Sequence, residues 1–283
     1  MTDIKKLVEI SIQALENAYK IHEELGDKGL KSVQKNEHGD TSLVGDIEAE
    51  KAVIDIFKNA SIPLRIISEE HGQVDLSDNP KFLAVLDGLD GTSVYQKARG
   101  KGRYGTMFDI FSNINPNYSD YIFSGVMEHS SKILYYAVKS KGGVLIKNNK
   151  SMSLTCSSTD KLDSSTKIYV DQFFDGKRKI TFIFDNFISK LDGYNLLRQD
   201  SSAIHYVDLS NGKADLVLEC TRKGNLEIGV AFGLVNEAGG VIVTKDGVSI
   251  ENKKFLVLGQ NKFIPIISAS NMKLAHELIK KIN

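Results

Sequence analysis

The chain has 283 residues, of which 41% are hydrophobic, and its 36 Lys and Arg residues balance its 36 Asp and Glu residues. This length allows one large or two medium domains, and a net charge of zero argues against a bulk polyanion such as duplex DNA as a partner. No window approaches eighteen consecutive apolar residues, and Cys156 and Cys220 form no CxxC pair. We therefore expect a cytoplasmic protein with reduced thiols that binds neither a membrane nor nucleic acid.

The first third of the chain predicts two helices and two short strands. Apolar residues at helical spacing predict an amphipathic helix over 3–25, and a second helix is predicted over 46–57 with Asp46 at or near its N-cap. Apolar runs predict strands over 64–67 and 82–86; Ser68-Glu69-Glu70 follows the first and Asp87 the second. Acids at the ends of buried strands are poorly placed for a core and well placed for a site.

The middle of the chain predicts an antiparallel sheet. Apolar runs separated by turn residues predict strands over 105–111, 121–128 and 132–138. Turn signals follow at Gly142-Gly143 and Asn148-Asn149. We place a domain boundary in this region, which divides the chain into an N-terminal domain over 1–146 and a C-terminal domain over 147–283.

The second half mixes short strands with helices. The predicted strands cover 167–170, 181–184, 214–218 and 241–244, and the predicted helices cover 225–238 and 269–281. Gly239-Gly240 ends the first of these helices. Because strands and helices alternate throughout, the pattern predicts a layered α+β or α/β architecture.

The stretch Asp87-Gly-Leu-Asp-Gly-Thr92 is the strongest sign of chemistry. At about 4 Å and an effective dielectric of about 20, two such carboxylates repel by roughly 4 kcal/mol. A divalent cation removes this penalty, and carboxylate oxygens suit magnesium, manganese or calcium. Other acids lie at element ends, at Asp46, Glu69, Glu70 and Glu227. A single acid of this kind is more often a helix cap or a surface charge, whereas the close pair with its flanking glycines favours a site.

This stretch resembles the DPxDGT motif of the inositol monophosphatase superfamily, which also includes fructose-1,6-bisphosphatases and 3'-phosphoadenosine-5'-phosphate phosphatases. Further segments resemble the superfamily's motifs in the same order: 40–46, Ile67-Ser-Glu-Glu70, Arg198 to Asp215, Leu226 to Gly240, and Ile267 to Asn271. The resemblance covers nearly the whole chain. It implies a layered αβαβα sandwich of the sugar-phosphatase type, with mixed and antiparallel sheets between helix pairs.

The resemblance also implies a magnesium-dependent phosphomonoesterase that hydrolyses a small sugar or inositol phosphate through metal-activated water. Two to three Mg²⁺ ions are implied, with Mn²⁺ as a substitute. Glu69, Asp87 and the Leu89 carbonyl would hold one ion, and Asp87 would bridge to a second ion shared with Asp90 and Glu227. A third, weaker ion is implied near Glu69.

The implied catalytic residues are Thr92, Asp46 and Glu69. Thr92, hydrogen-bonded to Asp46, would orient and deprotonate a metal-bound water. The backbone N–H groups of Gly91, Thr92 and Ser93, which open a helix, would hold the phosphate, because a helix N-terminus offers unpaired donors and a favourable dipole.

The chain departs from the superfamily's pattern at several positions. Gly88 stands in place of the usual proline, which we expect to loosen the turn and lower metal affinity. Glu227 replaces the usual aspartate and has one more methylene of reach. Ser201 and Glu219 are implied to bind the substrate, with Cys220 as the competing alignment for Glu219.

A basic segment after Thr92 replaces the apolar segment of relatives. Lys97, Arg99, Lys101 and Arg103 lie within seven residues in a glycine-rich stretch. One interpretation is a mobile, solvated loop. The other is an anion clamp in which Arg99 and Arg103 bind a second phosphate of the substrate. On the second interpretation, replacing both by Ala raises KM for a bisphosphate more than for a monophosphate.

Three alternatives for the function stay open. Within the same class, the substrate is fructose-1,6-bisphosphate or 3'-phosphoadenosine-5'-phosphate. In another class, the chain is a non-catalytic descendant that binds an anion or RNA through the basic segment. Five acids that repel one another argue against that descendant. The partners we expect are a small phosphorylated substrate and, from the resemblance, a second copy in a homodimer.

Overall fold

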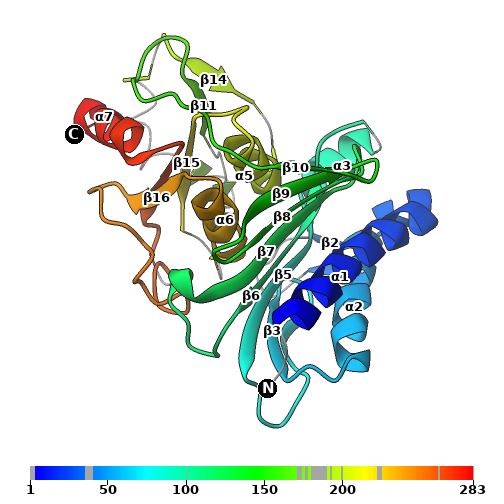
Figure 1. Ribbon diagram of the computed structural model, residues 1–283. Helices are drawn as coiled ribbons and strands as arrows, with labels where there is room; N and C mark the ends of the chain where they lie inside the picture. Colours follow the sequence, from blue (N-terminus) through cyan, green and yellow to red (C-terminus); the bar gives the residue numbers. More distant parts are fainter. Residues whose placement is uncertain are drawn as a thin grey trace.

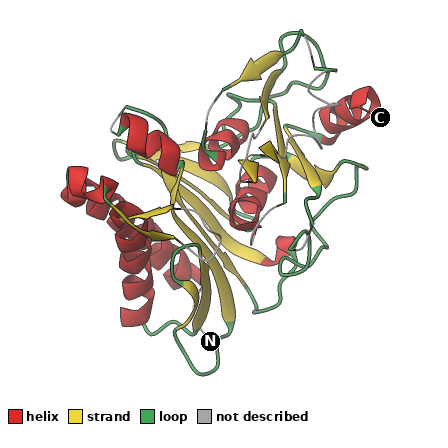
Figure 2. Cartoon of the chain, turned by 180° about the vertical axis from the view of Figure 1, so that it is seen from behind, coloured by secondary structure: helices red, strands yellow, loops and turns green. Residues whose placement is uncertain are grey.

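The chain folds into five stacked layers of helix, sheet, helix, sheet and helix in the computed structural model (Figure 1). The structure describes residues 4–35, 41–99, 101–170, 174–175, 178–179, 190–191, 193–198, 200–221, 225–260 and 262–282. Seen from behind, one helix pair covers the outer face of the large sheet and other helices lie between the two sheets (Figure 2). The predicted αβαβα sandwich with mixed and antiparallel sheets is confirmed.

The outer helix layer consists of α1 (Ile4–Leu25) and α2 (Val44–Asn59), close to the predicted bounds. The large sheet has the strand order β10-β9-β8-β7-β6-β5-β3-β4. Its strands are β3 (Leu64–Ser68), β4 (Gly72–Asp75), β5 (Phe82–Asp90), β6 (Gly105–Phe111), β7 (Tyr121–Glu128), β8 (Ile133–Val138), β9 (Gly142–Lys147) and β10 (Lys150–Ser153). Among the described strands of this large sheet, β3 and β5 are the one pair that runs in parallel, so the ends of these two strands lie at the same edge.

Strand β5 lies at the centre of the molecule and is buried on both faces. Ala84 and Leu86 pack into the core formed with α1 and α2, while Leu83 and Val85 pack into the core on the opposite face. This explains why residues 82–86 form an unbroken apolar run without polar alternation. The strand continues past the predicted end to Asp90, so both acids of the motif belong to it.

The inner layer and the second sheet complete the sandwich. The inner helices are α5 (Ser202–Ser210) and α6 (Leu226–Glu237), and the second sheet has the order β14-β11-β15-β17-β16. Its strands are β14 (Asn195–Leu197), β11 (Lys167–Val170), β15 (Leu216–Cys220), β17 (Pro265–Ala269) and β16 (Val241–Thr244), and α7 (Met272–Ile282) covers its outer face. Smaller elements are η1 (Gly26–Leu30), β1 (Ser32–Lys35), β2 (Thr41–Leu43), α3 (Thr92–Ala98), η2 (Tyr118–Asp120), β12 (Phe174–Asp175) and β13 (Arg178–Lys179).

Several predicted elements differ from the structure. The turn predicted at Gly142-Gly143 lies just before them, at 139–141, and these two residues begin β9. The turn predicted at Asn148-Asn149 is confirmed, and both residues have positive φ. The predicted boundary between 146 and 147 falls inside the β9–β10 hairpin, and the large sheet continues to Ser153. Helix α5 was not predicted. The predicted strand over 181–184 lies outside the described residues. Among the described helices, none is long and apolar enough to cross a bilayer.

Candidate active site

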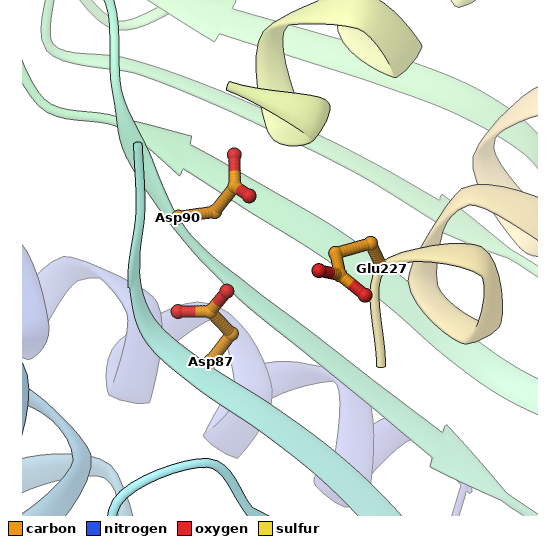
Figure 3. A group of neighbouring side chains, drawn as sticks. All are labelled: Asp87, Asp90 and Glu227. Carbon is orange, nitrogen blue, oxygen red and sulfur yellow. The ribbon is translucent and has the colours of Figure 1, made fainter. Parts of the chain in front are cut away.

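Three carboxylates meet at the end of strand β5. Asp87 and Asp90 come from β5, and Glu227 comes from the first turn of α6 (Figure 3). One oxygen from each lies within 4.8 Å of the others. Asp87 and Asp90 are buried, with 4% and 8% of their surfaces exposed, and Glu227 is partly exposed. The first and second halves of the chain therefore both contribute to this group.

A β-bulge explains how two acids three residues apart join one group. Residues i and i+3 of a regular strand point to opposite faces. Here Asp87 pairs with Met107 and Asp90 pairs with Gly105, so three steps along β5 oppose two steps along β6. The extra residue changes the direction in which the following side chains point, as bulges beside functional sites commonly do. Gly91 then turns the chain into α3 with a φ of 92°, a value that favours glycine.

The acids form one electrostatic group, in which carboxylates raise one another's pKa. Burial, followed by Glu69, Asp90 and Glu227, raises the pKa of Asp87 well above its usual range. Burial, followed by Glu227 and other carboxylates, does the same to the pKa of Glu69. A divalent cation would relieve both the repulsion and the desolvation, and the all-oxygen donor set suits a hard cation. The residues present therefore fit such an ion.

Asp90 is oriented by the start of α5. Its carboxylate accepts a hydrogen bond from the Ser201 hydroxyl and one from the backbone N–H of Ala203 at 2.7 Å. Both donors lie at the helix N-terminus, where unpaired N–H groups and the helix dipole favour an anion. Ser201, predicted to bind substrate, is 3% exposed, and its hydroxyl donates a hydrogen bond to Asp90 in this structure.

The predicted hydrogen bond between Thr92 and Asp46 is absent. The Thr92 hydroxyl instead donates to the Leu89 carbonyl at 3.0 Å. Asp46 lies in the first turn of α2 as predicted, and its Oδ2 accepts the Leu43 N–H at 2.7 Å. Burial raises the pKa of Asp46 to about 8, and Oδ1 has no hydrogen-bond partner among the described residues.

The segment predicted to hold phosphate opens α3 as expected. The first backbone bonds of this helix run from the N–H groups of Val94 and Tyr95 to the Gly91 carbonyl. The N–H groups of Thr92 and Ser93 precede these bonds, so the helix supplies no acceptor for them. They lie two and three residues after Asp90.

Gly88 serves a close approach between elements, which corrects the expectation of a loosened turn. A Cβ at this position would lie 2.5 Å from the Asp46 carbonyl oxygen and 2.7 Å from Glu50 Cγ. The N–H of Gly88 donates to Glu50 Oε1 at 3.3 Å, and its carbonyl accepts the Thr106 hydroxyl at 2.8 Å. The turn is therefore held on both sides, and glycine lets α2 pack directly against it.

Both arginines of the predicted anion clamp pair with carboxylates in this structure. The Arg103 guanidinium bonds Glu128 through Nε at 2.9 Å and Asp208 through Nη1 at 2.7 Å, with a second bond to each. Arg99 pairs with Asp27 at 2.9 Å. Lys97 lies in the last turn of helix α3, which ends at Ala98, so the first two residues of the basic segment are helical. Because both guanidinium groups already bind carboxylates, we do not propose them as substrate ligands.

Strand alternation puts Glu219 and Cys220 on opposite faces of β15. Cys220 packs with Leu218 in the core under α7, on the far face of the second sheet. Glu219 points to the other face, where its carboxylate accepts the Tyr206 hydroxyl of α5 at 2.6 Å. Glu219 is thus the residue of the two that faces the inner helix layer.

Sequence reasoning missed Glu50, which lies one helical turn after Asp46. Glu50 is fully buried and accepts hydrogen bonds from both turns that carry the acids. An available signal was the i, i+4 spacing of two acids on one face of α2, which points both toward the strand ends.

The chain is similar in sequence to two known phosphatases. No family model matches the chain. A fructose-1,6-bisphosphatase/inositol-1-monophosphatase from Methanothermobacter thermautotrophicus is 24% identical over 251 residues, which cover 86% of this chain and 83% of that protein. A bifunctional NADP phosphatase/NAD kinase from Methanococcus maripaludis is 24% identical over 239 residues, but these cover only 40% of that protein.

Solved structures share the fold. An inositol monophosphatase from Anabaena superposes with a TM-score of 0.74 at 16% identity, covering 99% of this chain and 96% of its own. A Pyrococcus horikoshii protein with similarities to inositol-1 monophosphatase superposes with a TM-score of 0.72 at 20% identity, covering 99% and 100%. The predicted resemblance is therefore confirmed: this chain has the fold of the inositol monophosphatase superfamily and is similar in sequence to it over most of its length.

Proposed function

We propose that this chain is a divalent-cation-dependent phosphomonoesterase that acts on a small sugar or inositol phosphate. The observation that carries this proposal is the convergence of Asp87, Asp90 and Glu227 within 4.8 Å at the β5 bulge. The names of the similar proteins support the reaction class. In a protein without a catalytic role, buried carboxylates that repel one another would only destabilise the fold.

The acids provide places for two ions. Asp87, Asp90 and Glu227 would hold one Mg²⁺ or Mn²⁺, and Glu69 and Asp87 with the Leu89 carbonyl would hold another. The Thr92 hydroxyl donates a hydrogen bond to that carbonyl at 3.0 Å. When bound, such cations lower the pKa of water and neutralise phosphate oxygens.

The chain's own groups would bind the phosphate and take the proton. The N–H groups of Thr92 and Ser93 open α3 beside Asp90 and would donate to phosphate oxygens. The Thr92 hydroxyl donates its hydrogen bond to the Leu89 carbonyl, so its oxygen can accept a hydrogen bond from water. Asp46 is the candidate proton acceptor, because a carboxylate with a pKa near 8 is a useful base at neutral pH.

The substrate's organic part would lie against the inner helix layer. Glu219 faces this layer from β15, and we assign it to binding a hydroxyl group of the substrate. Ser201 would contribute by holding Asp90. Since Arg99 and Arg103 are engaged elsewhere, nothing in the described basic segment favours a bisphosphate over a monophosphate.

A phosphate-release assay tests the proposal. The panel holds inositol 1-phosphate, fructose-1,6-bisphosphate, 3'-phosphoadenosine-5'-phosphate and NADP, each with Mg²⁺ and with chelator. We expect Mg²⁺-dependent release from at least one sugar or inositol phosphate, lost in Asp87→Asn. Asp109→Asn, a buried acid on β6, is the matched control and should retain activity. If the folded protein releases phosphate from no substrate, the non-catalytic alternative is favoured.

A further inference from the structure

The Glu50 carboxylate collects hydrogen-bond donors from several directions. Its oxygens accept from the Ser68 hydroxyl, from His71 Nδ1 at 3.0 Å, and from the backbone N–H groups of Glu69 at 3.2 Å, Glu70 at 3.0 Å and Gly88 at 3.3 Å. The side chain is fully buried. Glu50 comes from the middle of α2 and reaches the ends of β3 and β5 from the outer helix layer.

These donors lie in the two turns that carry the proposed cation ligands. Glu69 is itself a proposed ligand in the turn after β3. Gly88 stands between Asp87 and Leu89 in the other turn. The two strands pair in parallel, with Ser68 opposite Leu86, so the turns leave the sheet side by side. The Glu50 carboxylate therefore ties the turn after β3 to the bulged end of β5, in addition to the backbone hydrogen bond from the Glu69 N–H to the Leu86 carbonyl at 3.1 Å.

A carboxylate suits this position better than any isosteric group. It offers about four acceptor sites and no donor, which matches a set of N–H and O–H donors. An amide in the same place would direct an NH₂ group at one of these donors and leave a buried N–H unpaired, at about 1–3 kcal/mol each. Gly88, without a Cβ, is what allows Glu50 Cγ to approach this closely.

Glu50 also acts on the ligands through its charge. Its carboxylate is among the groups that raise the pKa of Glu69 and of Asp87. The same negative charge lowers the energy of a cation placed among these acids. The position and the negative charge of Glu50 therefore both favour cation binding.

We propose that Glu50 is a positioning residue for divalent-cation binding: without contacting the ion, it fixes the Glu69 and Gly88 turns so that the ligands on both face one point. This inference rests on the proposed function, because it concerns the ions that the phosphatase would use. It extends the site to a buried side chain on α2 that joins it to the outer helix layer.

Calorimetric titration with Mn²⁺ alone tests this inference on the full chain. Glu50→Gln should bind Mn²⁺ about 10- to 100-fold more weakly than the wild type, the usual effect of removing a group that orients metal ligands. Glu237→Gln is the matched control. Glu237 lies at the far end of α6 from Glu227 and accepts the backbone N–H groups of Ser140 and Gly142 at 2.8 and 2.7 Å. The Glu237→Gln variant should bind Mn²⁺ with an affinity within about twofold of that of the wild type.

The inference is overturned if Glu50→Gln binds Mn²⁺ as tightly as the wild type. It is also overturned if Glu237→Gln loses as much Mn²⁺ affinity as Glu50→Gln. If Glu50→Gln does not fold, Ser68→Ala replaces it, because this change removes one donor to Glu50 and spares the carboxylates. A loss of about 3- to 10-fold then supports the inference, and no loss overturns it. Wild-type protein that binds no Mn²⁺ refutes the proposed function itself, whereas tight wild-type binding with an unchanged variant refutes only the role of Glu50.

Discussion

Two groups of buried acids in this molecule are neutralised in different ways. Glu128 and Asp208, which are 3% and 5% exposed in their side chains, are bridged by the guanidinium of Arg103. At the β5 bulge, Asp87 meets Asp90 and Glu227, and its pKa is raised by burial and by other carboxylates. The chain supplies its own cation to the first group, and we infer that an external ion completes the second. Buried acids therefore indicate a cation site where they raise one another's pKa, and not where an arginine of the same chain pairs with them.

Breaking the first group should cost the most stability. Arg103→Met leaves Glu128 without the guanidinium and Asp208 with the longer pair to Lys213 at 4.0 Å, and we expect a loss of about 3 kcal/mol in the free energy of unfolding. Chemical denaturation measures it. A loss below about 1 kcal/mol would show that the bridge is as weak as a surface ion pair. Activity per folded molecule should show no selective rise in KM for a bisphosphate.

Breaking the second group should cost activity instead. Asp87→Asn removes the carboxylate shared by both proposed ions, and kcat/KM should fall at least about 100-fold, beyond the range for groups that only orient ligands. Steady-state phosphate release measures it. Loss of one of the repelling charges should leave the metal-free protein as stable as wild type or more so. Retained activity would remove Asp87 from the proposed centre.

An added cation should distinguish the two groups directly. The raised pKa values of Asp87 and Glu69 mean that these acids favour the folded state at low pH, and this contribution is lost as pH rises through their folded pKa values. Metal-free protein should therefore lose stability as pH rises above the ordinary carboxyl pKa of about 4. Mg²⁺ at 100 times its Kd should restore about 2.7 kcal/mol at pH 8. Thermal unfolding with and without Mg²⁺ measures both effects.

The smallest effect is expected at Arg99. Its partner Asp27 is 86% exposed in its side chain, and such surface pairs contribute about 0–1 kcal/mol. Arg99→Ala should therefore change stability by less than about 1 kcal/mol and change KM equally for mono- and bisphosphates. A selective rise in KM for a bisphosphate would restore the anion-clamp hypothesis for this residue.

Sequence reasoning succeeded where the signal is local. The period of the apolar residues gave α1, α2 and the strands β6 to β8, and the Asp87–Thr92 stretch gave the centre of the site. It failed where contacts join distant residues. The pairing of Arg103 with Asp208 spans 105 positions, and no local pattern separates it from a solvated basic loop. The same holds for Glu50 and Gly88, whose contact depends on how closely α2 packs on β5.

Crystals soaked in Mn²⁺ and measured by anomalous diffraction test the central claim most directly. The account predicts an anomalous peak between the carboxylates of Asp87, Asp90 and Glu227, and its loss in Asp87→Asn crystals. No peak among these three residues at saturating Mn²⁺, in crystals of active protein, would contradict the claim that this group holds the catalytic cation.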